Sequence, residues 1–151
     1  MAHRSKITAP PQPRKSIVLI KRSKKRFFRN HSAIFEALQK VAKEYGDYDV
    51  EVFSDNPLPT QAETMAMFNR AFMVVAPHGG GESNLYFSEP GTILVEGLCH
   101  PPNLCYRNHM QSLGHRYYGI YLKERTCFDL TPADILTPVR KYLDIIVELT
   151  S

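Results

Sequence analysis

The sequence predicts an α/β domain in which a parallel sheet lies between two layers of helices. Apolar runs of strand length alternate with amphipathic segments, in the order β-α-β-α-β-α-β-α-β-α. Residues 71–76 form an unbroken apolar run, rich in Val and Phe, typical of a strand buried on both faces. A glycine turn and a short helix connect it to a second buried run at residues 92–96, an order that gives parallel strands and a right-handed crossover. For about five strands, we expect the order 2-1-3-4-5.

The first strand and the first helix lie before residue 47. Residues 16–20 (SIVLI) are apolar throughout and predict a short buried strand. We expect a helix over residues 32–45, because its apolar side chains fall on one stripe: Ile34, Leu38, Val41 and Tyr45. Asn30 or Ser32 can cap the start of this helix, and Gly46 ends it.

The second strand and the second helix flank a proline-rich turn. Residues 48–53 alternate polar and apolar side chains, as in a strand near the edge of a sheet. Thr60 and Glu63 have the spacing of a capping box, in which each side chain accepts a hydrogen bond from the backbone N–H of the other residue. This pair predicts a helix over residues 61–70.

The second half of the chain continues the alternation. Pro77 ends the central strand, because proline has no N–H to donate, and a short helix follows at residues 85–87. A helix is expected at 106–113, a fifth strand at 117–122, and a last helix with Pro132 at its first position. The expected buried face of the last helix consists of Ile135, Val139, Tyr142, Ile146 and Leu149.

Length and charge separate a short basic end from a folded body. The 151 residues have the size of one domain, and we expect residues 1–15 to be a flexible tail or linker and residues 16–151 to be the domain. Residues 1–30 contain ten Lys and Arg and no acidic residue, against nine basic and fifteen acidic residues in the remainder. The basic run is either a solvated tail or a nucleic-acid patch. No apolar run approaches the ~18 residues of a membrane span, and we expect no export signal in this chain.

The three cysteines, Cys99, Cys105 and Cys127, show no metal-binding spacing. In an oxidising compartment Cys99 can pair with Cys105 or with Cys127. Free buried thiols are the alternative.

Two loops of the expected fold combine into a candidate anion site. In the order 2-1-3-4-5, the loop after the first strand, with Arg22 and Arg26, faces the loop after the third, which contains the glycines 79–81. Guanidinium groups bind phosphate bidentately, and a glycine turn before a helix exposes backbone N–H groups, so the pair of loops fits a diphosphate. Glu96 can accept hydrogen bonds from ribose hydroxyls or form an ion pair or a helix cap. The alternative is that the glycines only make a tight turn and that His78 is a loop histidine.

The sequence lacks the motifs of several enzyme classes. The chain contains no GxSxG, no GxxxxGK[ST], and no GxGxxG after its first strand. His100, His109 and His115 have no partners at metal-ligand spacing, and no Asp-x-Asp ends a strand, so we expect no metal site. No catalytic residue can be assigned.

The motifs Arg22-x-x-x-Arg26-x-x-x-Asn30 and PHGGGESNLYFSEPGTILVE resemble the glycosyltransferase 61 family. The resemblance runs from about residue 16 to residue 122. The residues that it implies in donor binding are Arg22, Arg26, Asn30, His78, Gly79, Gly80, Gly81, Ser83, Asn84 and Glu96. Gly80 and Glu82 differ from the Ala and the apolar residue that are common in the family.

The resemblance implies a Rossmann-like domain, similar to the C-terminal, donor-binding half of a GT-B glycosyltransferase. It implies an inverting, metal-independent transfer from a nucleotide sugar, a UDP-sugar above all, to a protein or glycan acceptor, with no cofactor. Because the resemblance is to the donor-binding half alone, we expect this sequence to lack the acceptor-binding half, from which such enzymes often supply the catalytic base. Family members that modify secreted proteins work in the lumen of the ER or Golgi.

Two other functions fit the same residues. The chain can be a non-catalytic α/β module that uses its basic N-terminal segment on nucleic acid or within a larger assembly. It can also be a small nucleotide-dependent enzyme that is complete in itself, although no acid–base pair is visible.

Overall fold

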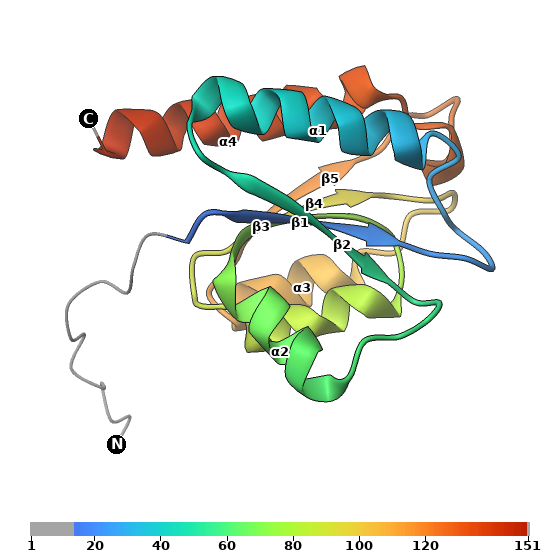
Figure 1. Ribbon diagram of the computed structural model, residues 1–151. Helices are drawn as coiled ribbons and strands as arrows, with labels where there is room; N and C mark the ends of the chain where they lie inside the picture. Colours follow the sequence, from blue (N-terminus) through green and yellow to red (C-terminus); the bar gives the residue numbers. More distant parts are fainter. Residues whose placement is uncertain (1–13, 151) are drawn as a thin grey trace.

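The computed structural model describes residues 14–150 and contains one five-stranded parallel sheet. The strands are β1 (Ser16–Lys21), β2 (Asp49–Ser54), β3 (Ala71–Pro77), β4 (Ile93–Gly97) and β5 (Arg116–Ile120). Their order in the sheet is β2-β1-β3-β4-β5, with β1 and β3 side by side in the middle (Figure 1). The predicted fold class and strand order are therefore confirmed.

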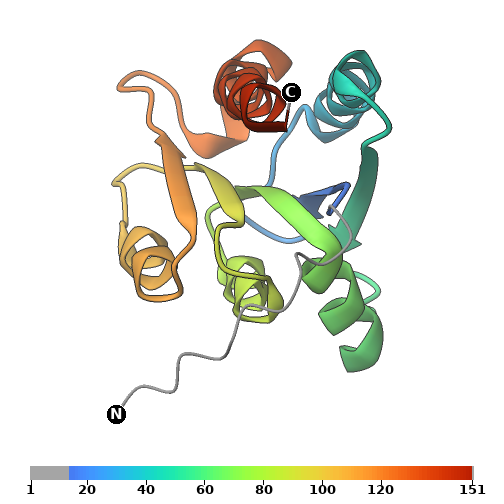
Figure 2. The same cartoon turned by 90° about the vertical axis from the view of Figure 1, so that its left-hand side faces the viewer.

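Helices cover both faces of the sheet. Helices α1 (His31–Tyr45) and α4 (Pro132–Thr150) lie on one face, and α2 (Gln61–Arg70), the 3-10 helix η1 (Gly80–Phe87) and α3 (Cys105–Ser112) lie on the other (Figure 2). All residues of β3 and β4 are buried, as expected for central strands with helices on both faces. Each face has its own apolar core, one containing Leu19, Leu38 and Leu143, the other Val18, Phe68 and Leu94.

The N-cap residues of α2 and α1 make different side-chain contacts. Thr60 accepts a hydrogen bond from the N–H of Glu63 and the Glu63 carboxylate accepts one from the N–H of Thr60, so the capping box is confirmed. Asn30 stands at the N-cap position of α1, but its side chain makes no capping hydrogen bond. Its amide instead donates to the carbonyl oxygen of Leu130 (3.2 Å), so Asn30 connects the start of α1 to the segment before α4.

The buried face of α4 corrects one expectation. Ile135, Val139 and Leu143 are fully buried, whereas Leu149, which was predicted to be buried, is 74% exposed. Periodicity predicts an apolar face along the whole length of a helix, but the core ends before the last turn of α4. Figure 1 shows that the C-terminal end of α4, which contains Leu149, extends beyond the end of α1.

The segment between β3 and β4 also differs from the expected one. Instead of a short helix at residues 85–87, a 3-10 helix begins at Gly80, so the glycines form its first turn as well as the turn before it. This brings Glu82 into the first turn of η1, where its side chain is fully buried. Within residues 14–150, no helix is long and apolar enough to cross a bilayer.

The start of the described chain is held at the amino edge of the sheet. Arg14 donates hydrogen bonds to the carbonyl oxygens of Ala71 (3.0 Å) and Glu89 (3.3 Å) and to the hydroxyl of Thr92. Arg14 was placed in the tail by prediction, and residues 1–13 of that tail lie outside the described part of the chain. The carboxyl edge, where the candidate site was predicted, is the opposite edge of the sheet.

Candidate functional site

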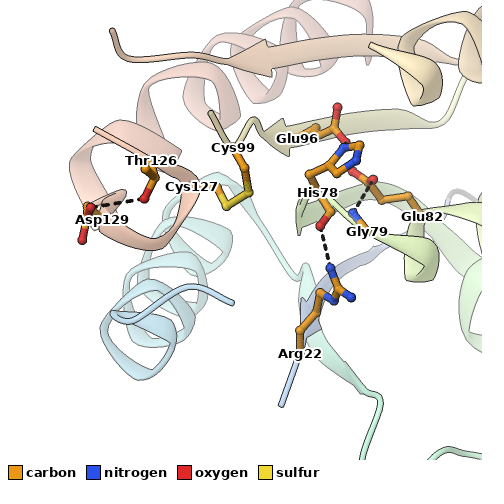
Figure 3. Close-up of a disulfide and its surroundings, with 9 residues drawn as sticks. All are labelled: Arg22, His78, Gly79, Glu82, Glu96, Cys99, Thr126, Cys127 and Asp129. Carbon is orange, nitrogen blue, oxygen red and sulfur yellow. Dashed lines mark hydrogen bonds and ion pairs between the residues drawn. A yellow bond between two sulfur atoms is a disulfide. The ribbon is translucent and has the colours of Figure 1, made fainter. Parts of the chain in front are cut away.

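The loops after β1 and β3 meet at the carboxyl edge of the sheet, as the strand order predicts. The Nη1 atom of Arg22 donates a hydrogen bond to the carbonyl oxygen of His78 (2.8 Å; Figure 3). A Cβ atom added to Gly79 would lie 2.2 Å from the same Nη1 atom. The glycine at position 79 therefore allows the guanidinium group to lie directly against the backbone of the turn.

The other two residues of the first motif do not join this contact. Arg26 has a positive φ of 51°, and its Nε atom is buried without a hydrogen-bond partner. The Asn30 side chain is bound to Leu130, as described above. Among the described residues, only Arg22 of the three is hydrogen-bonded to the glycine turn.

The glycine turn has one closed side and one open side. A Cβ atom on Gly81 would lie 3.2 Å from Ile20 at the end of β1, whereas one on Gly80 would have no heavy atom within 4 Å. Asn84 donates a hydrogen bond to the carbonyl oxygen of Gly81 (3.0 Å), and Ser83 is exposed. The exposed residues of the glycine turn are thus Gly80 and Ser83, and the Asn84 side chain holds the turn in shape through its hydrogen bond to Gly81.

His78 is held by a chain of hydrogen bonds that crosses three strands. Its Nδ1 atom lies 2.9 Å from Oε2 of Glu96 on β4, and the hydroxyl of Tyr117 on β5 donates to Oε1 of Glu96 (2.6 Å). Burial, followed by the hydrogen bond to Glu96, raises the pKa of Tyr117, so its hydroxyl keeps its proton at neutral pH and donates the hydrogen bond. Both carboxylate oxygens of Glu96 are in use within the protein.

A second carboxyl group lies beside this chain. Glu82 is 0% exposed, and its Oε2 atom accepts a hydrogen bond from the N–H of Gly79 (3.2 Å). Its other oxygen, Oε1, is buried and has no partner. Burial and the neighbouring Glu96 carboxylate raise the pKa of Glu82 well above its ordinary value. In Figure 3 the imidazole ring of His78 lies between Glu82 and Glu96.

The loop after β4 is fixed by a disulfide bond. Cys99 is bonded to Cys127, 28 residues further along the chain, and Cys105 is a free, exposed cysteine. Next to it, a Cβ atom on Gly97 would lie 2.8 Å from side-chain atoms of both Phe28 and Leu130. Of the alternatives that the sequence left open, the structure thus has the Cys99–Cys127 pair.

A pocket of about 280 Å³ lies further along the carboxyl edge, between the end of β5 and the start of α4. Its lining includes Tyr118, Tyr121, Asp134 and Pro138, and none of the predicted site residues. The Asp134 carboxylate already accepts hydrogen bonds from Arg125 and Thr131. The candidate site is therefore the glycine turn with Arg22, and this pocket is a separate feature.

The two loops were predictable from the sequence, but the residues that support them were not. Tyr117 was counted only as a strand residue, because nothing in an alternating pattern shows that a tyrosine hydroxyl will reach a carboxylate on the next strand. The three histidines considered for metal binding lie elsewhere: the Nε2 atom of His115, for example, bonds the carbonyl oxygen of Leu85 (2.8 Å). Glu82 was noted only as a departure from the family pattern.

A search of curated proteins finds no match to this chain. A comparison with family models, in contrast, supports the resemblance. The family model described as Glycosyltransferase 61 matches residues 2–95, which include β1, the glycine turn and the first three residues of β4. Because this match covers well over half of the sequence, the chain belongs to the glycosyltransferase 61 family.

Proposed function

We propose that the carboxyl edge of the sheet, at the glycine turn and Arg22, binds the donor of a glycosyl transfer, a UDP-sugar. The observation that carries the proposal is the contact of the Arg22 guanidinium with the backbone at His78 and Gly79. It places a positive charge beside an exposed turn at the point where the strand order reverses, which is where open α/β sheets bind their ligands. The hydrogen bond to His78 uses one of the five N–H donors of the guanidinium group.

The proposed reaction is an inverting transfer in which a nucleoside diphosphate leaves the sugar. Negative charge develops on the departing diphosphate, and Arg22, Arg26 and the amides of the turn stabilise it in place of a metal ion at the phosphates. Gly80 and Ser83 are exposed in this turn and can approach the donor closely. Asn84 keeps the turn in shape through its bond to Gly81.

His78 and Glu96 have different parts in this proposal. Since both oxygens of Glu96 are bound to His78 and Tyr117, we propose that Glu96 orients the imidazole ring and does not contact a ribose. The Nε2 atom is then the ring nitrogen of His78 that remains for a phosphate or sugar oxygen. Asn30, bound to Leu130, supports the loop between β1 and α1 from outside the site.

We further propose that an acceptor-binding domain, not contained in the described residues, completes the enzyme and supplies the catalytic base. Its acceptor would be a protein or a glycan. The Cys99–Cys127 disulfide supports a location in an oxidising compartment such as the lumen of the ER or Golgi.

Titration calorimetry of the whole chain with UDP, UDP-GlcNAc, UDP-xylose, GDP and ADP tests donor binding. We expect uridine-selective binding that Arg22→Ala weakens about 10- to 100-fold, the loss of one charge-assisted hydrogen bond. Lys24→Ala is the matched control, because Lys24 is an exposed cation of the same loop. It should bind UDP with nearly the affinity of the unchanged chain.

The same titrations separate this function from nucleic-acid binding. Lys21, Lys24 and Lys25 are exposed together, which favours the alternative of a polyanion surface. Binding that falls steeply with salt, is equal for all nucleosides and is weakened as much by Lys24→Ala as by Arg22→Ala would reject the donor site in favour of that surface.

A further inference from the structure

His78, Glu82 and Glu96 form a buried cluster with two carboxyl groups. One of them, Glu96, is enough to orient the His78 ring. The three residues come from the turn directly after β3, from η1 and from β4, and they are 7%, 0% and 0% exposed. One nitrogen or oxygen atom of each lies within 4.8 Å of the corresponding atoms of the other two. Because the two glutamates are fully covered, they cannot be explained by contacts with a donor in the open crevice.

Each of the two carboxylates has one oxygen fixed from outside the cluster. Tyr117 donates to Oε1 of Glu96 (2.6 Å), and the N–H of Gly79 donates to Oε2 of Glu82 (3.2 Å). The remaining oxygens are Oε2 of Glu96, which lies 2.9 Å from Nδ1 of His78, and Oε1 of Glu82, which is buried without a partner. Outer hydrogen bonds of this kind orient the carboxylates that bind a metal ion.

The charge of the cluster is not balanced by the surrounding protein. Within residues 14–150, neither Glu82 nor Glu96 forms an ion pair with a lysine or an arginine. The nearby Arg22 donates to the carbonyl oxygen of His78. Two buried carboxylates without a cation are costly, by several kcal/mol per ion. A proton neutralises one of them, whereas a divalent cation neutralises both.

We propose that His78, Glu82 and Glu96 bind a divalent transition-metal ion through Nδ1 and one oxygen of each carboxylate. A mixed set of imidazole and carboxylate ligands suits Zn²⁺ or Mn²⁺. Ligand atoms bound at about 2.1 Å lie roughly 3 to 3.5 Å from their neighbours, so one side chain has to move by about 1 Å. His78 gives up its Nδ1 proton to solvent on binding, and the ion replaces the hydrogen bond to Glu96. The ion ties β3, η1 and β4 together behind the glycine turn, and its binding does not depend on a donor.

Direct metal titration of the chelator-treated chain tests this site. We expect one Zn²⁺ or Mn²⁺ per chain by calorimetry, and Co²⁺ to give the visible absorption bands of a protein-bound ion. Glu82→Gln keeps the size of the side chain and removes a charged ligand, and it should weaken binding about tenfold or more. Tyr117→Phe removes only the outer hydrogen bond to Glu96 and should also weaken binding about tenfold.

Two variants control for other sources of binding. Cys105→Ser removes an exposed thiol, which is itself a zinc ligand, and Glu124→Gln removes an exposed carboxylate; both should bind with unchanged affinity. Circular dichroism establishes that each variant is folded. Absence of stoichiometric binding to the unchanged chain would overturn the site and leave a pair of carboxyls that share a proton. Metal affinity as high as that of the unchanged chain in the folded Glu82→Gln and Tyr117→Phe variants would overturn it as well.

Discussion

The polar side chains at the two edges of the sheet lie in opposite environments. At the amino edge, Arg14 is bound to three acceptors, and Glu51 accepts hydrogen bonds from Ser16 (2.7 Å) and Arg70 (2.9 Å). The hydrogen bond from Arg70 holds the pKa of Glu51 below its ordinary value. At the carboxyl edge, burial instead raises the pKa of Glu82.

Polar atoms left without partners show the same contrast. Four buried side-chain atoms of the described residues lack a hydrogen-bond partner: three belong to Arg26, Asp55 and Glu82, which follow β1, β2 and β3, and the fourth is Nδ1 of His115, just before β5. Buried polar groups are normally paired, so such a concentration marks the edge where a ligand or a further domain is expected. We infer that the polar contacts of the amino edge serve stability, and the proposed function assigns binding to the carboxyl edge.

Removal of the disulfide should have the largest effect on stability. Cys99→Ser opens a cross-link between residues 28 positions apart, which corresponds to a loss of about 3 kcal/mol in the free energy of unfolding. Urea denaturation measures this loss. Cys105→Ser is the control, because Cys105 is unpaired. If both variants unfold at the same urea concentration, the carboxyl edge does not depend on its covalent link.

Gly97→Ala should destabilise the same edge through packing. Its Cβ atom would lie 2.8 Å from both Phe28 and Leu130, which are buried, and relief of such a clash costs about 1–3 kcal/mol. Thermal denaturation monitored by circular dichroism checks this. Gly80→Ala adds the same methyl group with no heavy atom within 4 Å, so its melting temperature should stay nearly unchanged. An equal loss in both variants would mean that backbone flexibility, and not the clash, is responsible.

Gly79→Ala should separate binding from stability. The new Cβ atom collides with the guanidinium of Arg22, the free end of a flexible side chain that can turn away, so we expect little loss of stability. Donor affinity should fall about tenfold, because Arg22 no longer lies against the turn. Calorimetry with UDP measures the change, with Lys24→Ala, which changes an exposed cation of the loop after β1, as the control. Unchanged affinity for UDP in a folded Gly79→Ala chain would place the donor away from Arg22.

These residues also show how far the sequence can be interpreted. The strand order and the meeting of Arg22 with the glycine turn were predictable, because alternation and burial determine which loops share an edge. Leu143 was missed and Leu149 was wrongly placed in the core, because a periodic pattern shows the face of a helix and not where the core ends. The inward turn of Glu82 and the reach of Tyr117 were not predictable, because they depend on rotamers and on the register of β4 and β5. The roles of the site residues in donor binding remain predictions.

At the amino edge, Arg14→Ala should reduce stability without affecting binding. The variant loses partly buried hydrogen bonds to Ala71 and Thr92, which corresponds to about 1 kcal/mol. Urea denaturation measures the loss, and calorimetry with UDP should give the affinity of the unchanged chain. Weaker UDP binding in this variant would break the division between the two edges. Lys15→Ala, which removes an exposed cation next to it, is the control.

His115, just before β5, should give the smallest effect, seen only as a pH dependence. Burial lowers its pKa, and the nearby Arg14 and His109 lower it further against the opposing hydrogen bond to Leu85. The unfolded chain, with an ordinary histidine pKa of about 6.5, therefore takes up a proton before the folded chain does. The contribution of the neutral His115 side chain to stability is complete above pH 6.5 and is lost as the pH falls through its lower pKa in the folded chain. The free energy of unfolding, measured from pH 7.5 to 5, should therefore decrease less in His115→Gln than in the unchanged chain.

His109→Gln, an exposed change on α3, is the control and should leave the pH dependence of the free energy of unfolding almost as it was. Equal slopes in all three chains would show that His115 is solvated, and the amino edge would then be less closed than its hydrogen bonds indicate.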